Sequence, residues 1–287
     1  MTSWQEESGR RLLASAGMDR TVRIWDAADG RLIRTLEDHT GPVRAVTSWQ
    51  EESGRRLLAS AGTDGTVRIW DAADGRLIGT LAGHTGPVLA VTSWQEESGQ
   101  RLLASASGDE TVRIWDAADG RLLQTLAGHT DEVLAVTSWQ DESGRRLLAS
   151  ASDDETVRIW DAADGRLLQT LAGHTGPVSA VTSWQEASGR RLLASASDDE
   201  TVRIWDAADG SLLRTLEGHT DPVWAVTSWQ EASGRRLLAS TSGDRTVRIW
   251  DAANGRLLRT LEGHTARCGG DVVAGGAGPA DAGLRQS

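Results

Sequence analysis

The chain has 287 residues, of which 39% are hydrophobic and 25% charged, a composition typical of a folded globular protein. No apolar run is long enough to span a membrane, the N-terminus lacks the features of a signal peptide, and the net charge of -11 opposes binding to nucleic acid. The single cysteine, Cys268, cannot form an internal disulfide. We therefore expect a cytoplasmic protein with no nucleic-acid partner and no membrane partner.

Tryptophan and histidine recur every 45 residues along the chain. Two series of tryptophans and one of histidines keep this spacing: Trp4 to Trp229, Trp25 to Trp250 and His39 to His264. A fixed period of this length is typical of architectures built from repeated structural units. We therefore expect one repeat domain over residues 1–265, divided into units 1–38, 39–83, 84–128, 129–173, 174–218 and 219–263.

Within unit 39–83, four segments have strand patterns, 43–49, 56–61, 66–71 and 76–81. The segments 50–54 and 72–75 between them carry the Gly and Asp residues that tight hairpin turns need. Each unit is thus predicted to be a four-stranded antiparallel sheet. One such sheet cannot bury both faces alone, so the units must pack face to face around a common axis. The predicted fold is an all-β propeller with six blades.

The recurring motifs resemble those of the WD40-repeat family, and most closely its highly repetitive bacterial propellers. Gly-His-Thr-Gly-Pro-Val, Leu-Leu-Ala-Ser and Asp-Glu-Thr-Val-Arg-Ile-Trp-Asp recur from residue 1 to about residue 265. The resemblance implies a structural tetrad of His, Ser, Asp and Trp in each unit. These tetrads would be His39, Ser60, Asp64 and Trp70; His84, Ser105, Asp109 and Trp115; His129, Ser150, Asp154 and Trp160; His174, Ser195, Asp199 and Trp205; and His219, Ser240, Asp244 and Trp250.

Each tetrad is expected to be a chain of hydrogen bonds that ties the loop before the first strand to the second and third strands. A buried Trp needs a partner for its N–H, and the Ser and Asp side chains supply acceptors. If six units close into a ring, His264 would complete the set begun by Ser15, Asp19 and Trp25. A catalytic Ser-His-Asp triad would require six equivalent active sites, so we expect no enzyme activity.

Both ends of the chain depart from the repeat. Met1 stands where later units have valine, so the first unit lacks its opening loop and half of its first strand. We expect Met1 to be a valine codon within a longer reading frame. Back-translation of the irregular Gly/Ala-rich tail, residues 266–287, matches a seventh repeat read out of frame, although a natural tail is the alternative. The parent propeller is therefore expected to have seven or more blades.

The units differ from one another mainly at three positions. The first lies five residues after the histidine, and the other two flank the tetrad aspartate in the b–c turn, which joins the second and third strands. In a four-stranded meander these positions share one face. The candidate partner-binding residues are Arg44, Leu89, Leu134, Ser179 and Trp224, then Met18, Thr63, Asp153 and Asp198, and then Arg20 and Arg245.

By the family resemblance, this variable face is expected to bind a partner. Trp224, Leu89 and Leu134 are of the apolar type found at binding hot spots. Arg20 and Arg245 would form a basic spot if their blades adjoin across the ring closure, and neutral drift of exposed residues is the alternative explanation. The repeated charged turns on the opposite face are interpreted as solvated.

The expected function is a non-catalytic protein-protein interaction scaffold or sensor that binds a protein or peptide on the face bearing the b–c turns. The sequence contains no histidine pair at metal-ligand spacing, no calcium loop and no phosphate loop, so no metal or cofactor is expected. Two alternatives remain open. The chain is a truncated gene fragment without independent function, or a partial propeller that self-associates through open blade faces.

Overall fold

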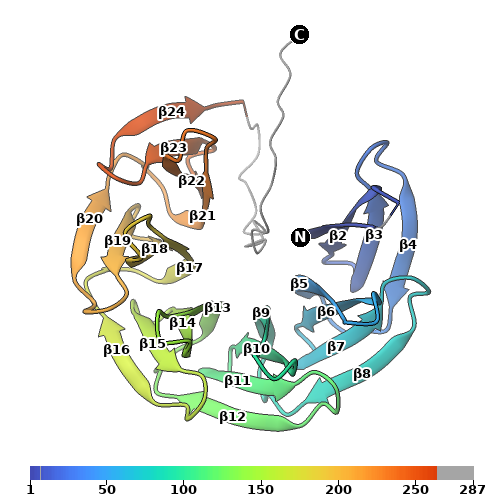
Figure 1. The fold of residues 1–287 in the computed structure, drawn as a ribbon. Helices are drawn as coiled ribbons and strands as arrows, with labels where there is room; N and C mark the ends of the chain where they lie inside the picture. The colour runs from blue at the N-terminus through green and yellow to red at the C-terminus, as the bar shows by residue number, and fades with distance from the viewer. Residues whose placement is uncertain (7, 264–287) are drawn as a thin grey trace.

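The computed structural model describes residues 1–6 and 8–263, which form an arc of six β-sheets (Figure 1). The inner strands of the arc line a central cavity, called the channel below. Each sheet, called a blade below, has four antiparallel strands in chain order. Throughout these residues the only regular elements are strands, and none of them forms a helix that could cross a membrane. The predicted all-β fold with six four-stranded blades is confirmed.

Blades 1 to 3 comprise β1 (Thr2–Gln5), β2 (Arg11–Ala16), β3 (Thr21–Asp26) and β4 (Leu32–Glu37); β5 (Val43–Gln50), β6 (Arg56–Gly62), β7 (Thr66–Asp71) and β8 (Leu77–Ala82); and β9 (Val88–Gln95), β10 (Arg101–Ser107), β11 (Thr111–Asp116) and β12 (Leu122–Ala127). Blades 4 to 6 comprise β13 (Val133–Gln140), β14 (Arg146–Ser152), β15 (Val157–Asp161) and β16 (Leu167–Leu171); β17 (Val178–Gln185), β18 (Arg191–Ser197), β19 (Val202–Asp206) and β20 (Leu212–Leu216); and β21 (Val223–Gln230), β22 (Arg236–Ser242), β23 (Val247–Asp251) and β24 (Leu257–Leu261).

The first strand of each blade lies beside the channel and the fourth lies at the outer rim (Figure 1). In blade 2 the tetrad serine, Ser60, lies in the second strand. It pairs with Val46 of the first strand and with Arg68 of the third. A register shift follows Val43 in the inner strand. The shift adds one residue to the channel-lining strand, and its position recurs in the inner strands of blades 4 to 6.

Neighbouring blades pack through one apolar interface that recurs along the arc. Between blades 3 and 4, Trp94 and Ile114 of blade 3 pack with Val133, Leu148 and Trp160 of blade 4. The corresponding residues form the cores between the other neighbouring blades. Burial of each large apolar side chain contributes about 1.5 to 3 kcal/mol, so these interfaces supply most of the stabilisation.

Over residues 1–6 and 8–263 the arc does not close, and no described blade covers either of its two end faces (Figure 1). Leu261 in β24 is 48% exposed, whereas the corresponding Leu216 in β20 is 2% exposed. At the other end, Trp25 in β3 is only partly buried, whereas Trp70 in β7 is 2% exposed. Each end of the arc therefore presents one half of the apolar interface that joins the other blades.

Two expectations depended on closure of the ring. Arg20 and Arg245 do not lie on adjoining blades, because blades 1 and 6 border the opening, so the basic spot expected there is wrong (Figure 1). His264, expected to complete the tetrad of blade 1, lies outside the described residues, as does the tail from 266 to 287.

Candidate functional site

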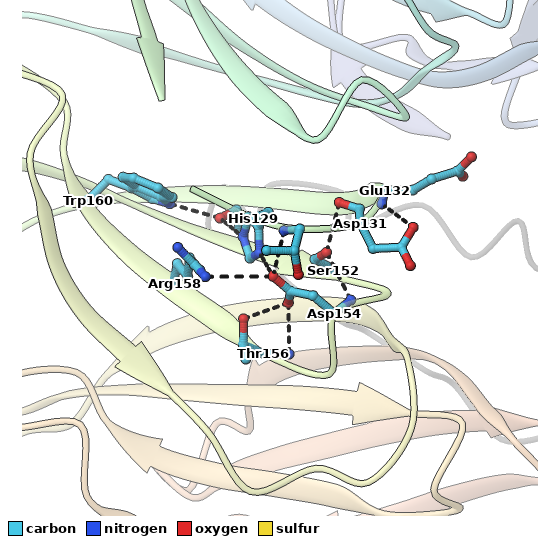
Figure 2. Close-up of polar contacts among 10 residues, drawn as sticks. His129, Asp131, Glu132, Ser152, Asp154, Thr156, Arg158 and Trp160 are labelled. Carbon is cyan, nitrogen blue, oxygen red and sulfur yellow. Dashed lines mark hydrogen bonds and ion pairs between the residues drawn. The ribbon is translucent and has the colours of Figure 1, made fainter. Parts of the chain in front are cut away.

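The four tetrad side chains of blade 4 form a continuous chain of hydrogen bonds (Figure 2). The Asp154 carboxylate accepts from Nδ1 of His129 at 2.7 Å, which leaves Nε2 to accept the Ser150 hydroxyl at 2.7 Å. The Ser150 oxygen in turn accepts the indole N–H of Trp160 at 2.8 Å. The chain joins the loop before β13 to strands β14 and β15.

Burial and hydrogen bonding fix the charge states of this tetrad. Burial lowers the pKa of His129 and outweighs the nearby Asp154, so the imidazole is neutral. Burial alone would raise the pKa of Asp154, but hydrogen bonds from Thr156 and His129 lower it on balance. In blades 3 and 6 the same balance lowers the pKa of Asp109 and Asp244 to about 2. The carboxylate is therefore the only charged member of the tetrad.

The same arrangement recurs in blades 2, 3, 5 and 6, with every histidine-to-aspartate and histidine-to-serine distance between 2.7 and 2.8 Å. Blade 1 differs. Trp25 donates to Ser15 at 2.8 Å, but Asp19 is exposed and pairs with Arg23 at 2.6 Å. In blades 2 to 6 the serine is fully buried, so a substrate cannot reach its hydroxyl. Each tetrad therefore ties the loop before the inner strand to the second and third strands of its own blade.

A cavity of about 960 Å³ occupies the centre of the arc and is lined by the inner strands. Five of the candidate partner-binding residues line it, each at the second position of its strand: Arg44, Leu89, Leu134, Ser179 and Trp224. The sequence placed them on the face that bears the b–c turns. The structure places them inside the channel, at the end where those turns lie, and we call this end the upper mouth.

Contacts between the inner strands and the b–c turns define the upper mouth. Arg44 donates to the sulfur of Met18 at 3.5 Å, a contact between blades 2 and 1. The Ser179 hydroxyl donates to Asp198 at 3.3 Å within blade 5. The Trp224 ring packs against the backbone of Gly243, where an added Cβ would lie 3.3 Å from the indole.

The remaining candidate residues lie in the b–c turns themselves. Met18 is 61% exposed at the end of the arc. The backbone N–H groups of Thr63 and Asp153 donate to the loop before the inner strand, at 2.8 Å to Pro42 and 3.0 Å to Glu132. Arg20 and Arg245 are exposed residues with φ of 71° and 68°.

One sector of the upper mouth is acidic. Asp153 is surrounded by the carboxylates of Asp131, Glu132 and Asp198, and burial together with these like charges raises its pKa. Burial also raises the pKa of Asp198. Asp131 and Glu132 were not among the residues predicted from the sequence. The available signal was that their loop reads Thr-Asp-Glu-Val where the neighbouring units read Thr-Gly-Pro-Val.

Charged groups are thus distributed unevenly around the channel. Arg44 lies toward blade 1, Leu89 and Leu134 form an apolar stretch, and the acidic sector spans blades 4 and 5 next to Trp224 of blade 6. Among the described residues there is no cluster of three or more His, Cys, Asp or Glu side chains that could hold a metal ion. The upper mouth can therefore bind through charge and apolar contact.

Comparison with known proteins identifies repeats across most of the chain. The family model described as "WD domain, G-beta repeat" matches residues 7–26, 30–71, 75–116, 120–161, 165–206 and 210–251. A 38-residue stretch is 47% identical to an uncharacterized WD repeat-containing protein of Synechocystis sp.. That match covers 13% of this chain and 11% of the relative's length.

Proposed function

Because the chain belongs to the WD40-repeat family, whose repeats generally mediate protein-protein interaction, we propose that it is a non-catalytic interaction module. Its binding site is the upper mouth of the channel, on the face that bears the b–c turns. The observation that carries this proposal is the concentration of differences between otherwise uniform blades at that mouth. The blade interfaces and tetrads, by contrast, are nearly invariant from blade to blade.

The chemistry of the upper mouth favours a peptide segment that combines a basic side chain with an apolar one. A cation placed among Asp131, Glu132, Asp153 and Asp198 would relieve the repulsion that raises the pKa of Asp153. An apolar side chain would pack on Trp224, a residue type enriched at binding hot spots. A basic spot formed by Arg20 and Arg245 at the ring closure would have favoured an acidic peptide. Because those residues do not adjoin, we propose a peptide with a basic side chain instead.

A display selection of random peptides against the full chain tests the proposal. Selected peptides are expected to carry Arg or Lys near an apolar residue, and their affinities are measured by calorimetry. Trp224→Ala and Asp153→Asn are each expected to weaken binding about tenfold, since each removes a central contact. Glu231→Gln, on the opposite face, is the control and should change affinity little.

Two results would contradict this proposal. One is a set of selected peptides that bind all three variants as well as the unmodified chain. The other is a failure of the selection to yield any saturable binder, which would favour the alternative of a gene fragment without independent function.

A second candidate function is self-association through the open faces of the arc. Leu261 and Trp25 belong to the two halves of the interface that elsewhere joins neighbouring blades, and both are less buried than their equivalents. An exposed apolar sheet face of this kind favours association. We propose that a second copy of the chain covers it at high concentration.

Analytical ultracentrifugation of two matched variants tests this second candidate. Leu261→Arg changes an exposed leucine at the open end and should abolish self-association with little loss of stability. Leu216→Arg changes the equivalent buried leucine and should instead destabilise the fold. A chain that stays monomeric at all concentrations would exclude self-association.

A further inference from the structure

An arginine begins the second strand of every blade. In blades 2 to 6 these residues are partly buried, and we call them the arginine row: Arg56, Arg101, Arg146, Arg191 and Arg236. Each pairs with the glutamine that ends the inner strand, as Arg56 does with Gln50. They therefore lie at the end of the channel opposite the upper mouth, and Arg56 and Arg191 line the cavity itself.

Members of the row are close enough to affect one another across blade boundaries. The positive charges of Arg146 and Arg56 act on Arg101, and those of Arg146 and Arg236 act on Arg191. Burial, with these like charges at Arg101 and Arg191, lowers the pKa of the row. In a protein of net charge -11, the lower end of the channel is thus a local concentration of positive charge.

In the part of the chain that the structure describes, the arginine row forms no close ion pair with a carboxylate, although the charge of Glu96 acts on Arg146. Among residues 1–6 and 8–263, none of its members has an ion pair within 4.0 Å. Arg56 and Arg101 contact only the side-chain oxygen of a glutamine, at 3.4 and 3.2 Å. Arg146 lies over the ring of Trp94 of the preceding blade, 5.9 Å from its centre. The Nε atoms of Arg146 and Arg191 are buried without a hydrogen-bond partner.

The residue just before each row member behaves differently, which makes this lack of partners informative. Arg55 pairs with Asp71 at 2.6 Å, Arg145 with Asp141 at 3.1 Å and Arg190 with Asp206 at 2.5 Å. These arginines are neutralised by carboxylates, whereas blade 3 has Gln100 at this position, which pairs with Asp116 at 2.7 Å. In blades 2, 4, 5 and 6 two consecutive arginines therefore differ, because the first has an ion pair and the second has none. Of the row itself, Arg56 and Arg191 line the channel.

We propose that the arginine row binds a compact anion that carries several phosphate groups, at the lower end of the channel. A guanidinium presents paired N–H donors that match phosphate oxygens, and blades 2 and 5 supply such donors to a common cavity through Arg56 and Arg191. Threonine and serine hydroxyls of the inner strands line the cavity next to the row, as Thr137 and Ser138 do, and add neutral donors.

The surroundings of the row select a compact ligand over a long one. The turns next to the row carry carboxylates, among them Glu51, Asp141 and Glu231. Asp141 also lines the cavity. A nucleic acid or an extended acidic peptide would have to cross these carboxylates, whereas a small polyphosphate stays within the channel.

Calorimetric titration of the full chain with inorganic tripolyphosphate tests this site. Saturable binding is expected, because Arg56 and Arg191 line the cavity and Arg146 lies close enough to Arg191 to act on its charge. The double variant Arg146→Gln/Arg191→Gln should weaken binding about 100-fold, since each charged contact is worth about tenfold. Arg146→Lys/Arg191→Lys keeps the charge without the paired donors and should give an intermediate loss, which also guards against a folding defect in the glutamine variant.

The matched control is Arg145→Gln/Arg190→Gln, which removes the same charge one residue away and should change affinity less than about threefold. Absence of saturable binding to the unmodified chain would overturn the proposal, as would an equal loss in both glutamine doubles. If hexaglutamate displaced tripolyphosphate and bound with the same affinity, the site would not select phosphate groups, and the proposed ligand class would be wrong. Trp224→Ala should leave tripolyphosphate binding unchanged. The proposal for the arginine row and the proposal for the upper mouth are therefore tested independently.

Discussion

The tetrad aspartate accepts several of the hydrogen bonds that connect the polar side chains and loops within each blade. Asp154 accepts hydrogen bonds from His129, from the backbone of Thr130 and from both the backbone and hydroxyl of Thr156. Its side chain is only 5% exposed, so none of these donors would regain a full water partner if the carboxylate were removed.

Asp154→Ala is therefore expected to lower the free energy of unfolding by about 3 kcal/mol, measured by urea unfolding. Asp19→Ala supplies a natural control, because Asp19 occupies the same position in blade 1 but is exposed and lacks a described histidine partner. It should change stability far less. Equal losses in the two variants would contradict the structural role assigned to the tetrad.

Acidification is expected to destabilise the fold in two steps. Burial lowers the folded-state pKa of four histidines below the ordinary value of 6.5, namely His84, His129, His174 and His219. The contribution of these neutral histidines to the free energy of unfolding is therefore complete above pH 6.5. It is lost as the pH falls through their folded-state pKa values. Below the ordinary aspartate value of 3.8, a second loss follows as the pH approaches the value of about 2 at Asp109.

Urea unfolding between pH 8 and pH 2 measures this dependence. About 0.3 M salt is included to screen the long-range repulsion of the net negative charge, which acidification would otherwise relieve. An increase in the free energy of unfolding between pH 6.5 and pH 5 would contradict the assignment of neutral, buried histidines.

At the scale of the element, the b–c turn requires a left-handed residue after the tetrad aspartate. The position has a φ of 66° at Glu155 and 78° at Gly65, and the other non-glycine residues there have similar values. A left-handed conformation costs a residue with a Cβ about 1 kcal/mol, a cost that glycine avoids. Variation at this position, including Arg20 and Arg245, is thus limited by backbone strain as well as by binding.

Glu155→Gly is accordingly expected to raise the free energy of unfolding by about 0.5 to 1 kcal/mol. The reverse change, Gly65→Glu, should lower it by a similar amount. Urea unfolding of both variants checks the pair. A destabilising Glu155→Gly would mean that the Glu155 side chain makes a contact that outweighs the backbone strain.

Strand positions within a unit could be predicted from the sequence to within one residue. The segment 66–71 matches β7 without change, whereas 76–81 is shifted to Leu77–Ala82. The shift has a local cause, because the Asp74 side chain accepts the backbone N–H of Arg76 and the backbone N–H of Asp71 donates to the Arg76 carbonyl. Arg76 therefore belongs to the turn, where a side-chain-to-backbone hydrogen bond replaces strand pairing.

The residues proposed to bind a partner were less predictable than the strands. Comparison between units identified Trp224 and Asp153, because differences stand out against a uniform repeat. It did not identify Asp131, Glu132 or the arginine row. Arg146 and its equivalents are identical in every unit and so resemble scaffold residues, and their convergence depends on how the blades are arranged around the channel.

At the scale of the whole molecule, the arc has a gradient of stability. Blades 2 to 5 each have a neighbour on both faces, whereas blades 1 and 6 have one uncovered face. In repeat architectures each unit is stabilised by its own folding and by contacts with its neighbours. The end blades therefore lack about one interface each.

Hydrogen exchange is expected to reveal this gradient. Amides of β23 and β3 should exchange faster than those of β11 and β15, because local opening of an end blade breaks only one interface. Mass spectrometry of peptides from each blade measures the rates. Equal protection in all six blades would show that the end faces are covered in solution.

Whether the ring closes was left open by the sequence, which allowed both a ring completed by His264 and a partial propeller with open blade faces. Each blade interface is specified by local residues such as Trp94, Leu148 and Trp160, and these were recognisable from the repeat. Whether six blades meet depends on the small rotation between neighbouring blades, summed over five interfaces. No single residue determines that sum.

The recurrence of one interface along the arc has a consequence for how such a chain can change. Since each blade offers its neighbour the same apolar residues, a 45-residue cassette can be duplicated, deleted or exchanged without creating a new kind of junction. Recombination between cassettes would then reshuffle the residues at Leu89, Leu134, Ser179 and Trp224 while it leaves the packing intact. New recognition surfaces can thus arise by rearrangement of existing units, before any point mutation is selected.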